Sequence, residues 1–312
     1  MDFVDYIKNT LLWPLKRHKY DVKMKKLMSN PLEETKFVYR KNLGKELNID
    51  DPQDFNEKVQ WLKLNTDTSE WTRLSDKVLV RDFIKEKGLD EILIPIYGVW
   101  DKVSEIDFDS LPNSFVLKSN HGSGTVIVVR DKNLLDVRTA KIKMNRWLQT
   151  KYGAFSGELH YLKIQPKLYA EQLLVNRSKD ESSSMIDYKI HCINGKVYCI
   201  WVCANRTKES VETAIYDTEW KRHNEWATNS PHYHISTREF HKPANLGRMV
   251  EIAECLSSGF RQVRVDLYNN NGEIYFGEMT FTPASGTIDF FSQDFLNMMG
   301  AAISLPIKNV TK

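Results

Sequence analysis

Residues 115–130 read FVLKSNHGSGTVIVVR and predict a strand, a glycine-rich loop and a second strand. The first apolar run ends on Lys118, and the second, Val126–Val129, is short and β-branched, as a buried strand would be. Glycines let loop N–H groups approach phosphate oxygens closely, and Lys118 adds a positive charge beside them. The lysine precedes the glycines, so the pattern differs from a Walker A loop. Two readings stay open from this stretch alone: a polyphosphate site, or an ordinary hairpin with a flexible tip.

The composition is that of an ordinary globular protein with room for two or three subdomains. The chain has 312 residues, 41% hydrophobic and 27% charged, with a formal net charge of +3. So small a charge gives no argument for nucleic acid as a partner. The four cysteines form no CxxC pair, which predicts free thiols in a reducing compartment: Cys192, Cys199, Cys203 and Cys255. Because we find no signal peptide and no apolar stretch long enough to span a bilayer, we expect a cytoplasmic protein.

Residues 1–50 are predicted to form a separate, helical and basic segment. It opens with a rough apolar face that includes Phe3, Val4, Ile7 and Leu11. A basic cluster follows: Lys16, Arg17, His18, Lys19, Lys23, Lys25 and Lys26. A basic amphipathic helix can lie on an anionic membrane, which would make the protein peripheral to the inner face of that membrane. It can also pack on the main domain with its basic side in water, and Pro14 favours this second reading by interrupting the pattern.

The rest of the chain alternates helical and strand patterns. Helices are expected to begin at Phe55 and to span 77–87, 137–151, 246–258 and 292–302. Strands are expected at 92–99, 167–175, 185–191, 196–204, 262–268 and 273–281, with a loop-rich stretch at 217–243. Asn-Gly pairs predict hairpin turns at 194–195 and 269–272.

Polar residues recur in a fixed order along the predicted strands. They are Lys118, Glu171, Arg264, Asp266, Glu278 and Thr280. Residues two apart in a strand share a face, so the last four converge on one site if their two strands pair. Two carboxylates are the hard oxygen ligands that Mg²⁺ takes, with phosphates and waters completing the octahedron. The alternative is a set of polar residues on the exposed face of a hairpin.

This order resembles the ATP-grasp superfamily, and specifically its TupA-like branch, which is associated with teichuronopeptide, capsule and O-antigen biosynthesis. The resemblance covers roughly residues 50–300. It rests on Phe55-Asn56-Glu57-Lys58, Asp76-Lys77, Arg81-Asp82, Pro95-x-Tyr97-Gly98-Val99-Trp100, residues 115–124, Glu171, Asp187-Tyr188-Lys189, Arg264-x-Asp266 and Glu278-x-Thr280-Phe281. The glycine-rich segment and the terminal hairpin are specific in combination, and each is weak alone.

By this resemblance the chain is an α+β protein of the ATP-grasp fold, with a nucleotide cleft between two α+β lobes. The implied cofactors are ATP and Mg²⁺. The implied divisions are an N-terminal helical, basic segment (1–50), an N-terminal ATP-grasp subdomain (51–112), a central lobe with the glycine-rich loop (113–175) and a C-terminal lobe with the metal site (176–312).

The resemblance also implies roles for individual residues in binding the nucleotide. Lys118 is expected to contact the ATP phosphates, and the 120–124 loop is expected to close over them. The other expected nucleotide-binding residues are Lys77, Asn120, Gly122, Ser123, Gly124, Glu171, Leu173 and Lys189, of which Glu171 and Leu173 would meet adenine and ribose.

The metal and catalytic residues follow in the same way. Asp266, Glu278 and Thr280 are the expected metal ligands, although many ATP-grasp enzymes have Asn where Thr280 stands. Arg264 is expected to steady charge on the transferring group, and it is the expected catalytic residue together with Lys118. His121 either positions a phosphate or acyl-phosphate oxygen, or is structural.

The leading hypothesis is an ATP-dependent carboxylate–amine ligase that works through an acyl phosphate. By resemblance its substrates are a uronic-acid sugar or glycan precursor and an amino acid or other amine, in surface polysaccharide biosynthesis. The alternatives are a glycosyltransferase of capsule or O-antigen synthesis, which the lack of a clear Asp-x-Asp motif disfavours, and a non-catalytic ATP-binding protein. His232 and His234 have zinc-like spacing without further placed ligands. Arg206 and Arg222 either face an acidic sugar or belong to a solvated surface.

Overall fold

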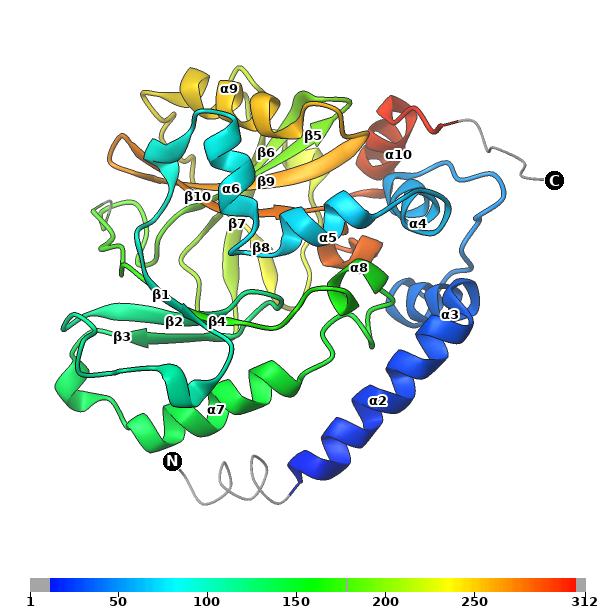
Figure 1. Cartoon of the computed structure of the whole chain (residues 1–312). Helices are drawn as coiled ribbons and strands as arrows, with labels where there is room; N and C mark the ends of the chain where they lie inside the picture. Colours follow the sequence, from blue (N-terminus) through cyan, green and yellow to red (C-terminus); the bar gives the residue numbers. More distant parts are fainter. Residues whose placement is uncertain (1–11, 178, 307–312) are drawn as a thin grey trace. The chain divides into compact units, whose positions relative to one another are not determined.

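The computed structural model describes residues 12–177 and 179–306, and the chain divides into two compact units (Figure 1). Unit 1 comprises Met1–Val38, Thr68–Arg81 and Ile94–Leu174, and unit 2 comprises Tyr39–Asp67, Asp82–Leu93 and Val175–Lys312. The chain therefore passes repeatedly from one unit to the other. The divisions expected after residues 50, 112 and 175 stay predictions. The apolar residues expected at the start of the chain, Phe3, Val4, Ile7 and Leu11, lie outside the described residues.

Unit 1 is built on a four-stranded antiparallel sheet with the strand order β1-β4-β2-β3. Its strands are β1 Ile96–Trp100, β2 Phe115–Ser119, β3 Val126–Val129 and β4 Leu168–Glu171. β2 and β3 form the expected hairpin around the glycine-rich loop, with Lys118 opposite Val126, so the hairpin is confirmed. β3 is an edge strand and exposes Val126 and Val128, so the expectation of a buried second strand was wrong. The strand expected at 92–99 was placed too early. A 3-10 turn occupies Asp90–Ile92, and β1 begins only after Pro95, which has no N–H to donate to a sheet.

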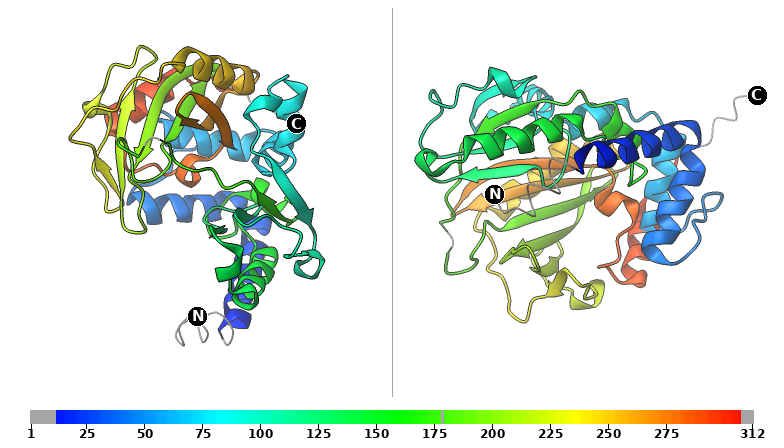
Figure 2. Two further views of the ribbon diagram at one scale, coloured as in Figure 1. Left: turned by 90° about the vertical axis from the view of Figure 1, so that its left-hand side faces the viewer. Right: turned by 90° about the horizontal axis from the view of Figure 1, so that it is seen from below.

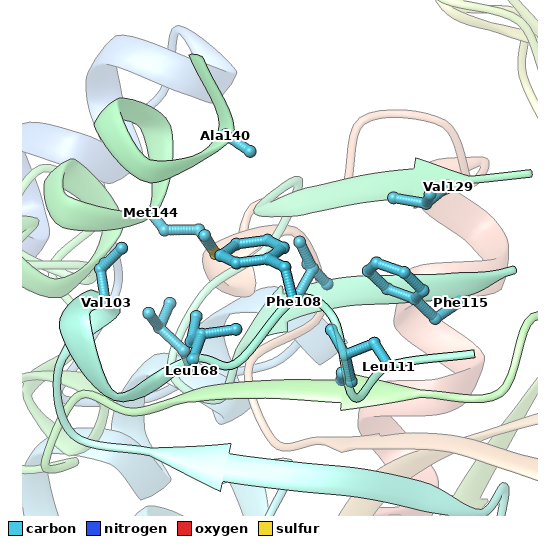
Figure 3. Close-up of a cluster of buried hydrophobic side chains, with 11 residues drawn as sticks. Val103, Phe108, Leu111, Phe115, Val129, Ala140, Met144 and Leu168 are labelled. Atoms are coloured by element: carbon cyan, nitrogen blue, oxygen red, sulfur yellow. The ribbon is translucent and has the colours of Figure 1, made fainter. Parts of the chain in front are cut away.

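Helix α7 (Val137–Gln149) covers one face of this sheet. Figure 3 shows Ala140 and Met144 of α7 beside Phe115 and Leu168 of the strands, and all four side chains are buried. The Asp136 carboxylate caps the helix by accepting a hydrogen bond from a backbone N–H of the first turn at 2.9 Å. The cap and the apolar face together hold α7 on the strands that carry the glycine-rich loop.

The remaining helices of unit 1 are short, apart from α2. They are α2 (Trp13–Ser29), the start of α3 (Pro31–Leu43), α5 (Ser69–Ser75) and α8 (Leu159–Leu162), while α6 (Val80–Glu86) begins in unit 1 and ends in unit 2. Pro14 lies in the first turn of α2, where a missing N–H costs little, so it does not interrupt the helix as the sequence suggested. The helix expected at 77–87 is shorter because the Asp76 carboxylate first closes a turn by accepting from Val78 N and Leu79 N. Across the described ranges, no helix combines the length and the apolar character needed to cross a bilayer.

Unit 2 is built on a six-stranded sheet with the order β10-β9-β5-β6-β7-β8. Its strands are β5 Asp187–Ile193, β6 Lys196–Ala204, β7 Val211–Tyr216, β8 Tyr233–Ile235, β9 Gln262–Asn270 and β10 Glu273–Thr280. Neighbouring strands are antiparallel except β7 and β8, which are parallel. Sequence patterns did not indicate β7, and β8 lies in the stretch expected to be loop-rich. β8 has only three residues, so it carries too little local pattern to be recognised.

Both hairpin turns predicted from Asn-Gly pairs are present in unit 2. Asn194 and Gly195 join β5 to β6 with φ angles of 50° and 77°, and Asn271 and Gly272 join β9 to β10 with φ angles of 58° and 91°. Two consecutive positive φ angles are typical of a type I′ turn, whose twist matches that of the paired strands. The second turn sets the register as far as Phe276 opposite Leu267, and a bulge at Gly277 then shifts β10 by one residue, so that Glu278 faces Asp266.

Helices complete unit 2: α4 (Phe55–Asn65), α9 (Leu246–Ser257) and α10 (Gln293–Ala302). A capping box starts α4, because Glu57 N donates to the Asp54 side chain at 2.9 Å and the Glu57 carboxylate accepts from Asp54 N. α10 passes so close to this end of α4 that a β-carbon on Gly300 would lie 2.2 Å from the Gln53 carbonyl oxygen. No side chain fits at Gly300 without a backbone shift.

Gly300→Ala is therefore expected to destabilise the protein by about 1–3 kcal/mol, because the added methyl group overpacks against backbone that cannot move aside cheaply. Urea unfolding followed by circular dichroism measures the change. Gly247→Ala in α9 is the matched control, since nothing lies within 4 Å of its β-carbon position and alanine favours a helix. Equal stabilities of the two variants would contradict the close contact at Gly300.

Candidate active site

In unit 1, Lys118 and Glu171 form an ion pair between adjacent strands. The two residues share a face of the β2–β4 pair, in which Lys118 lies opposite Tyr169 and Glu171 opposite Val116. The Glu171 side chain is 8% exposed and that of Lys118 is 26% exposed, so the ammonium is the more accessible group. The structure thus brings together Lys118, which was expected at the phosphates, and Glu171, which was expected near adenine and ribose. Leu173, expected beside Glu171, follows the end of β4 and is partly buried.

Asn120 anchors the glycine-rich loop from within. Its amide nitrogen donates to Asp76 Oδ2 at 2.8 Å and to Gln165 O at 2.9 Å, and its amide oxygen accepts from Lys167 N at 2.7 Å. Its backbone oxygen accepts from Lys77 N at 3.0 Å, which places the backbone of Lys77 beside the loop. Because both amide hydrogens of Asn120 are used inside the protein, its side chain positions the loop, while its backbone oxygen positions Lys77. Binding of the nucleotide by Asn120 itself stays a prediction.

The loop that follows is closed at its base and open at its tip. The hydroxyl groups of Ser119 and Thr125 lie 2.7 Å apart, and Ser119 N donates to Thr125 O. Gly124 has a φ of 71° and no atom within 4 Å of its β-carbon position, so it is needed for its backbone conformation. Gly122 is buried and Ser123 is exposed. This arrangement lets the tip present N–H groups while its ends stay fixed.

His121 is buried next to this anchor. Its ring nitrogens lie 3.3 Å from Asn120 Oδ1 and 3.3 Å from Thr150 O. Burial lowers the pKa of His121 to about 4, so the ring is neutral at physiological pH. A neutral ring cannot place a positive charge on a phosphate, although it can hydrogen bond. These contacts favour the structural reading of His121 over the catalytic one.

The depressed pKa of His121 predicts a pH dependence of stability. The unfolded histidine binds a proton below about pH 6.5 and the folded one only below about pH 4, so stability falls as the pH drops through this window. His121→Gln should reduce the loss of unfolding free energy between pH 7 and pH 5 by about 2 kcal/mol. Urea unfolding at both pH values measures it, with His234→Gln at an exposed position as the matched control. An unchanged pH dependence in His121→Gln would contradict the assignment.

In unit 2, the four polar residues of the terminal hairpin converge as the sequence predicted. Asp266 lies opposite Glu278 and Arg264 opposite Thr280 in the β9–β10 register. The Arg264 guanidinium donates to both Asp266 oxygens at 2.6 and 2.9 Å, to Glu278 Oε1 at 3.3 Å and to Thr280 Oγ1 at 3.1 Å. The Thr280 hydroxyl also donates to Glu278 Oε1 at 3.1 Å. One planar guanidinium therefore holds both expected metal-binding carboxylates and the expected third ligand.

Lys189 joins this cluster from the neighbouring strand β5, where it lies opposite Asp266. Its ammonium forms ion pairs with Asp266 and, at 2.9 Å, with Asp187. Burial by itself would lower the pKa of Lys189, but the Asp187 and Asp266 carboxylates raise it above its ordinary value. Arg206 then reaches Asp187 at 3.4 Å. Asp187 was not among the expected site residues, because nothing local in the sequence reveals that β5 pairs with β9. Arg206 was considered only as a possible contact to an acidic sugar, and its link to this cluster was not predicted.

These residues form a row of alternating charge, which we call the charge row: Glu278, Arg264, Asp266, Lys189, Asp187 and Arg206. Its middle is buried and its ends are open. The side chain of Asp266 is 3% exposed, whereas those of Glu278 and Arg206 are 32% and 40% exposed. A charged ligand therefore meets the row first at Glu278 or at Arg206.

The donor set of the charge row fits Mg²⁺. Asp266 and Glu278 provide hard carboxylate oxygens on adjacent strands, with the Thr280 hydroxyl beside them. Within the described part of the chain, no three or more His, Cys, Asp or Glu side chains are grouped so as to hold a metal ion. Mg²⁺ commonly takes only one or two protein carboxylates and completes its shell with phosphates and water. His232 and His234, whose spacing suggested zinc, belong to no such group among the described residues. The Nδ1 atom of His232 lies 3.0 Å from Glu209 O.

Two further side chains define the surroundings of the row. His191, two residues after Lys189 on β5, is buried between the rings of Phe55 and Phe291, with centroid distances of 6.0 and 5.5 Å. Burial, followed by the charges of Arg264 and Lys189, lowers the pKa of His191 well below its usual value. His191 is therefore a neutral aromatic side chain beside the charge row. Its position on the same face as Asp187 and Lys189 could have been predicted from the alternation of polar residues along β5. Arg222 is structural, since it donates to the carbonyl oxygens of loop residues 236 and 238.

The family model of the TupA-like ATPgrasp proteins matches residues 57–304. This chain belongs to that family. Its fold is accordingly α+β and ATP-grasp, as the sequence motifs predicted, and the match includes the glycine-rich loop and the charge row. No curated protein matches the chain.

Solved structures with distant similarity to this TupA-like protein include ligases. A D-alanine–D-alanine ligase from Bacillus anthracis complexed with ATP is 14% identical, with a TM-score of 0.40 over 73% of this chain and 62% of that one. The D-alanine–D-alanine ligase from Helicobacter pylori is 14% identical, with a TM-score of 0.42 over 81% and 67%. The ATP-grasp ligase PsnB complexed with minimal precursor, Mg and ADP is 12% identical, with a TM-score of 0.36 over 72% and 57%. This chain thus spans less than two thirds of the first and the third of these chains.

Proposed function

We propose that this TupA-like protein is an ATP-dependent ligase that joins a carboxylate to an amine through an acyl phosphate. The observation that carries the proposal is the convergence of Arg264, Asp266, Glu278 and Thr280 on one hairpin. The two carboxylates would hold Mg²⁺, and the guanidinium beside them can contact phosphate oxygens. Membership of the ATP-grasp family supports ATP as the phosphoryl donor.

The chemistry follows from the poor reactivity of a carboxylate. Transfer of the terminal phosphoryl group of ATP to a carboxylate oxygen releases ADP and forms an acyl phosphate. The nitrogen of an amine then attacks the carbonyl carbon, the bond from carbon to the phosphate oxygen breaks, and the amine loses a proton as inorganic phosphate leaves. The protein must bind phosphate charge and keep water away from the intermediate.

Each step has a residue suited to it in this proposal. Lys118 meets the ATP phosphates with its accessible ammonium, and Glu171 lies beside adenine and ribose. Arg264 stabilises charge on the transferring group, because its planar fork can contact two oxygens at once. Asp266 and Glu278 would hold Mg²⁺, which neutralises phosphate charge when bound.

The reaction needs no nucleophile from the protein. Burial raises the pKa of Cys192 and of Cys203 to about 12, and it raises that of Cys199 as well. These thiols stay protonated at neutral pH and are poor nucleophiles. Direct attack by the amine on the acyl phosphate is consistent with this.

We further propose a uronic-acid-containing glycan or precursor as the acid, and an amino acid or other amine as the nucleophile, in the synthesis of a surface polysaccharide such as capsule or O-antigen. The class comes from the resemblance to the TupA-like branch. The position of Arg206 supports it, since this exposed cation at one end of the charge row can attract a sugar carboxylate. The reaction would take place in the cytoplasm, where ATP is supplied.

ADP release tests the proposal. Purified protein is incubated with ATP, Mg²⁺ and pairs drawn from panels of uronic acids and amino acids. We expect ADP to form only with an acid and an amine together, and hydroxylamine in place of the amine to yield a hydroxamate from the acyl phosphate. Turnover of a sugar nucleotide without ATP would identify a glycosyltransferase instead, and ATP binding without ADP release by any pair would identify a non-catalytic protein.

A further inference from the structure

Helix α2 is fastened to unit 1 through one of its faces. Trp13 Nε1 donates to Gln149 Oε1 at 3.0 Å, and the Arg146 guanidinium lies 5.8 Å from the centroid of the Trp13 ring. Further along, Tyr20 packs edge-on against Phe155 with ring centroids 4.9 Å apart. These contacts fix the rotation of the helix about its axis and so decide which residues face away from unit 1.

The opposite face carries an exposed apolar line. Leu15 and Val22 lie seven residues apart, which places them within about 20° of each other around the helix axis. Their exposed fractions are 64% and 39%. Basic residues flank this line on both sides: Lys19 and Lys26 on one, His18 and Lys25 on the other. On the face turned away from unit 1, exposed apolar residues bordered by long cations can contact the acyl chains and the headgroups of a membrane interface together.

Positive charge is concentrated on this part of the molecule. α2 contains six Lys and Arg residues and a single acidic residue, and α7 contains four and none. The whole chain has a net charge of only +3, so the rest of the chain is net acidic. Among the described residues, 12–177 and 179–306, one of the six cations of α2 pairs with a carboxylate. This is Lys23, whose Nζ lies 2.9 Å from Glu34 Oε2. The others are available to an external anion.

The basic surface continues from α2 onto α7. The start of α2 meets the end of α7 at the contact between Trp13 and Gln149, and Figure 2 shows the two helices along the same side of unit 1. Arg138 and Lys141, three residues apart, are exposed cations on one side of α7, whereas the exposed Lys143 projects from another side. We call this surface of α2 and α7 the basic face. Together the two helices offer several exposed cations to lipid headgroups.

We propose that the basic face binds an anionic membrane surface, with Leu15 and Val22 inserted among the lipids and the flanking lysines on the headgroup phosphates. Each basic residue near such a surface strengthens binding about fivefold. A nucleic acid or an acidic polysaccharide could pair with the lysines, but it would leave the apolar line in water. The line between the lysines therefore favours lipid over other polyanions.

Vesicle sedimentation with the full chain tests this. We expect binding to vesicles of phosphatidylcholine mixed with phosphatidylglycerol to be at least about tenfold stronger than to phosphatidylcholine alone. Binding should weaken steeply between about 0.1 M and 1 M salt, because the screening length falls from about 10 Å to 3 Å. Failure of the full chain to bind anionic vesicles at the lower salt concentration would overturn the proposal.

Two variants separate the parts of the basic face. Lys19→Glu, Lys25→Glu and Lys26→Glu together should weaken binding by about a hundredfold or more. Leu15→Ser with Val22→Ser should weaken it about tenfold at unchanged charge, through lost insertion. The control has the same charge change on exposed lysines of unit 2: Lys208→Glu, Lys221→Glu and Lys242→Glu. Circular dichroism confirms that each variant is folded.

The control decides between a specific face and net charge. We expect the unit 2 variant to bind anionic vesicles within a few-fold of the unchanged protein. An equal loss in both charge variants would show that only net charge matters, and would overturn the proposal. Full binding by the Leu15→Ser, Val22→Ser variant, together with equal binding of the protein to heparin, would identify a general polyanion site and would also overturn it.

Discussion

Glu278→Gln is expected to lower ADP release by about a hundredfold or more at saturating ATP and Mg²⁺. The change keeps the shape of the side chain and removes the negative charge that a metal ion needs. Glu278 is also the more exposed carboxylate of the two that Arg264 holds, so it is the one that an incoming metal and phosphate can reach without disrupting the row. The amide can still accept from Arg264 and Thr280, which should preserve the hairpin.

The matched control for this variant lies on the same strand. Glu273→Gln makes the same chemical change at the exposed start of β10, where Glu273 pairs with Arg177 rather than with the charge row. We expect normal turnover from the control and an unchanged melting temperature for both variants. Full Mg²⁺-dependent ADP release by Glu278→Gln would show that the metal site lies elsewhere.

Arg264→Lys is expected to bind ATP within a few-fold of the unchanged protein and to turn over about a hundredfold more slowly. In the structure a single guanidinium reaches Asp266, Glu278 and Thr280 together. An ammonium cannot match that geometry, although it keeps the charge. Lys189 still neutralises Asp266 in the variant, so the ground state should change less than the transition state.

Calorimetry for ATP affinity and single-turnover ADP release separate these two effects. Arg248→Lys, on the surface of α9 between Glu91 and Glu251, is the control for an arginine that bridges carboxylates outside the site. If Arg264→Lys lost ATP affinity as much as turnover, Arg264 would act in ground-state binding instead. The melting temperature of the variant is measured as well, because a substitution in this buried cluster could lower activity by unfolding the protein.

Local signals explain what the sequence could predict. The Asn-Gly turns indicate the β5–β6 and β9–β10 hairpins, and alternation puts Arg264 and Asp266 on one face of β9 and Glu278 and Thr280 on one face of β10. The bulge at Gly277, which places the two pairs opposite each other, was not indicated by the sequence. The ATP-grasp assignment followed from the order of such motifs. The partner of Lys189 could not be predicted, since it depends on the pairing of β5 with β9 across a long stretch of chain.

Other features escaped prediction because they depend on tertiary contacts. The hydrogen bonds of the Asn120 side chain to Asp76, Gln165 and Lys167 were not predicted, because these partners are distant in sequence. The neutral state of His121 results from burial, which no local pattern reports. β7 and β8 form a parallel pair joined by a long connection, and such a pair leaves no hairpin signal.

The interleaving of the two units has a consequence for biosynthesis on the ribosome. Unit 1 lacks β4 until residue 171 has been made. The partners of α4 in unit 2 are made much later than α4 itself. The Asn56 side chain, for example, bonds to the backbone of Ile288, 232 residues later. Contacts so distant in sequence close slowly, because a large loop must lose its freedom before they form. The nascent chain therefore emerges with the apolar face of α4 uncovered until the residues around Ile288 have been made, and surface exposed in this way favours aggregation before folding is complete.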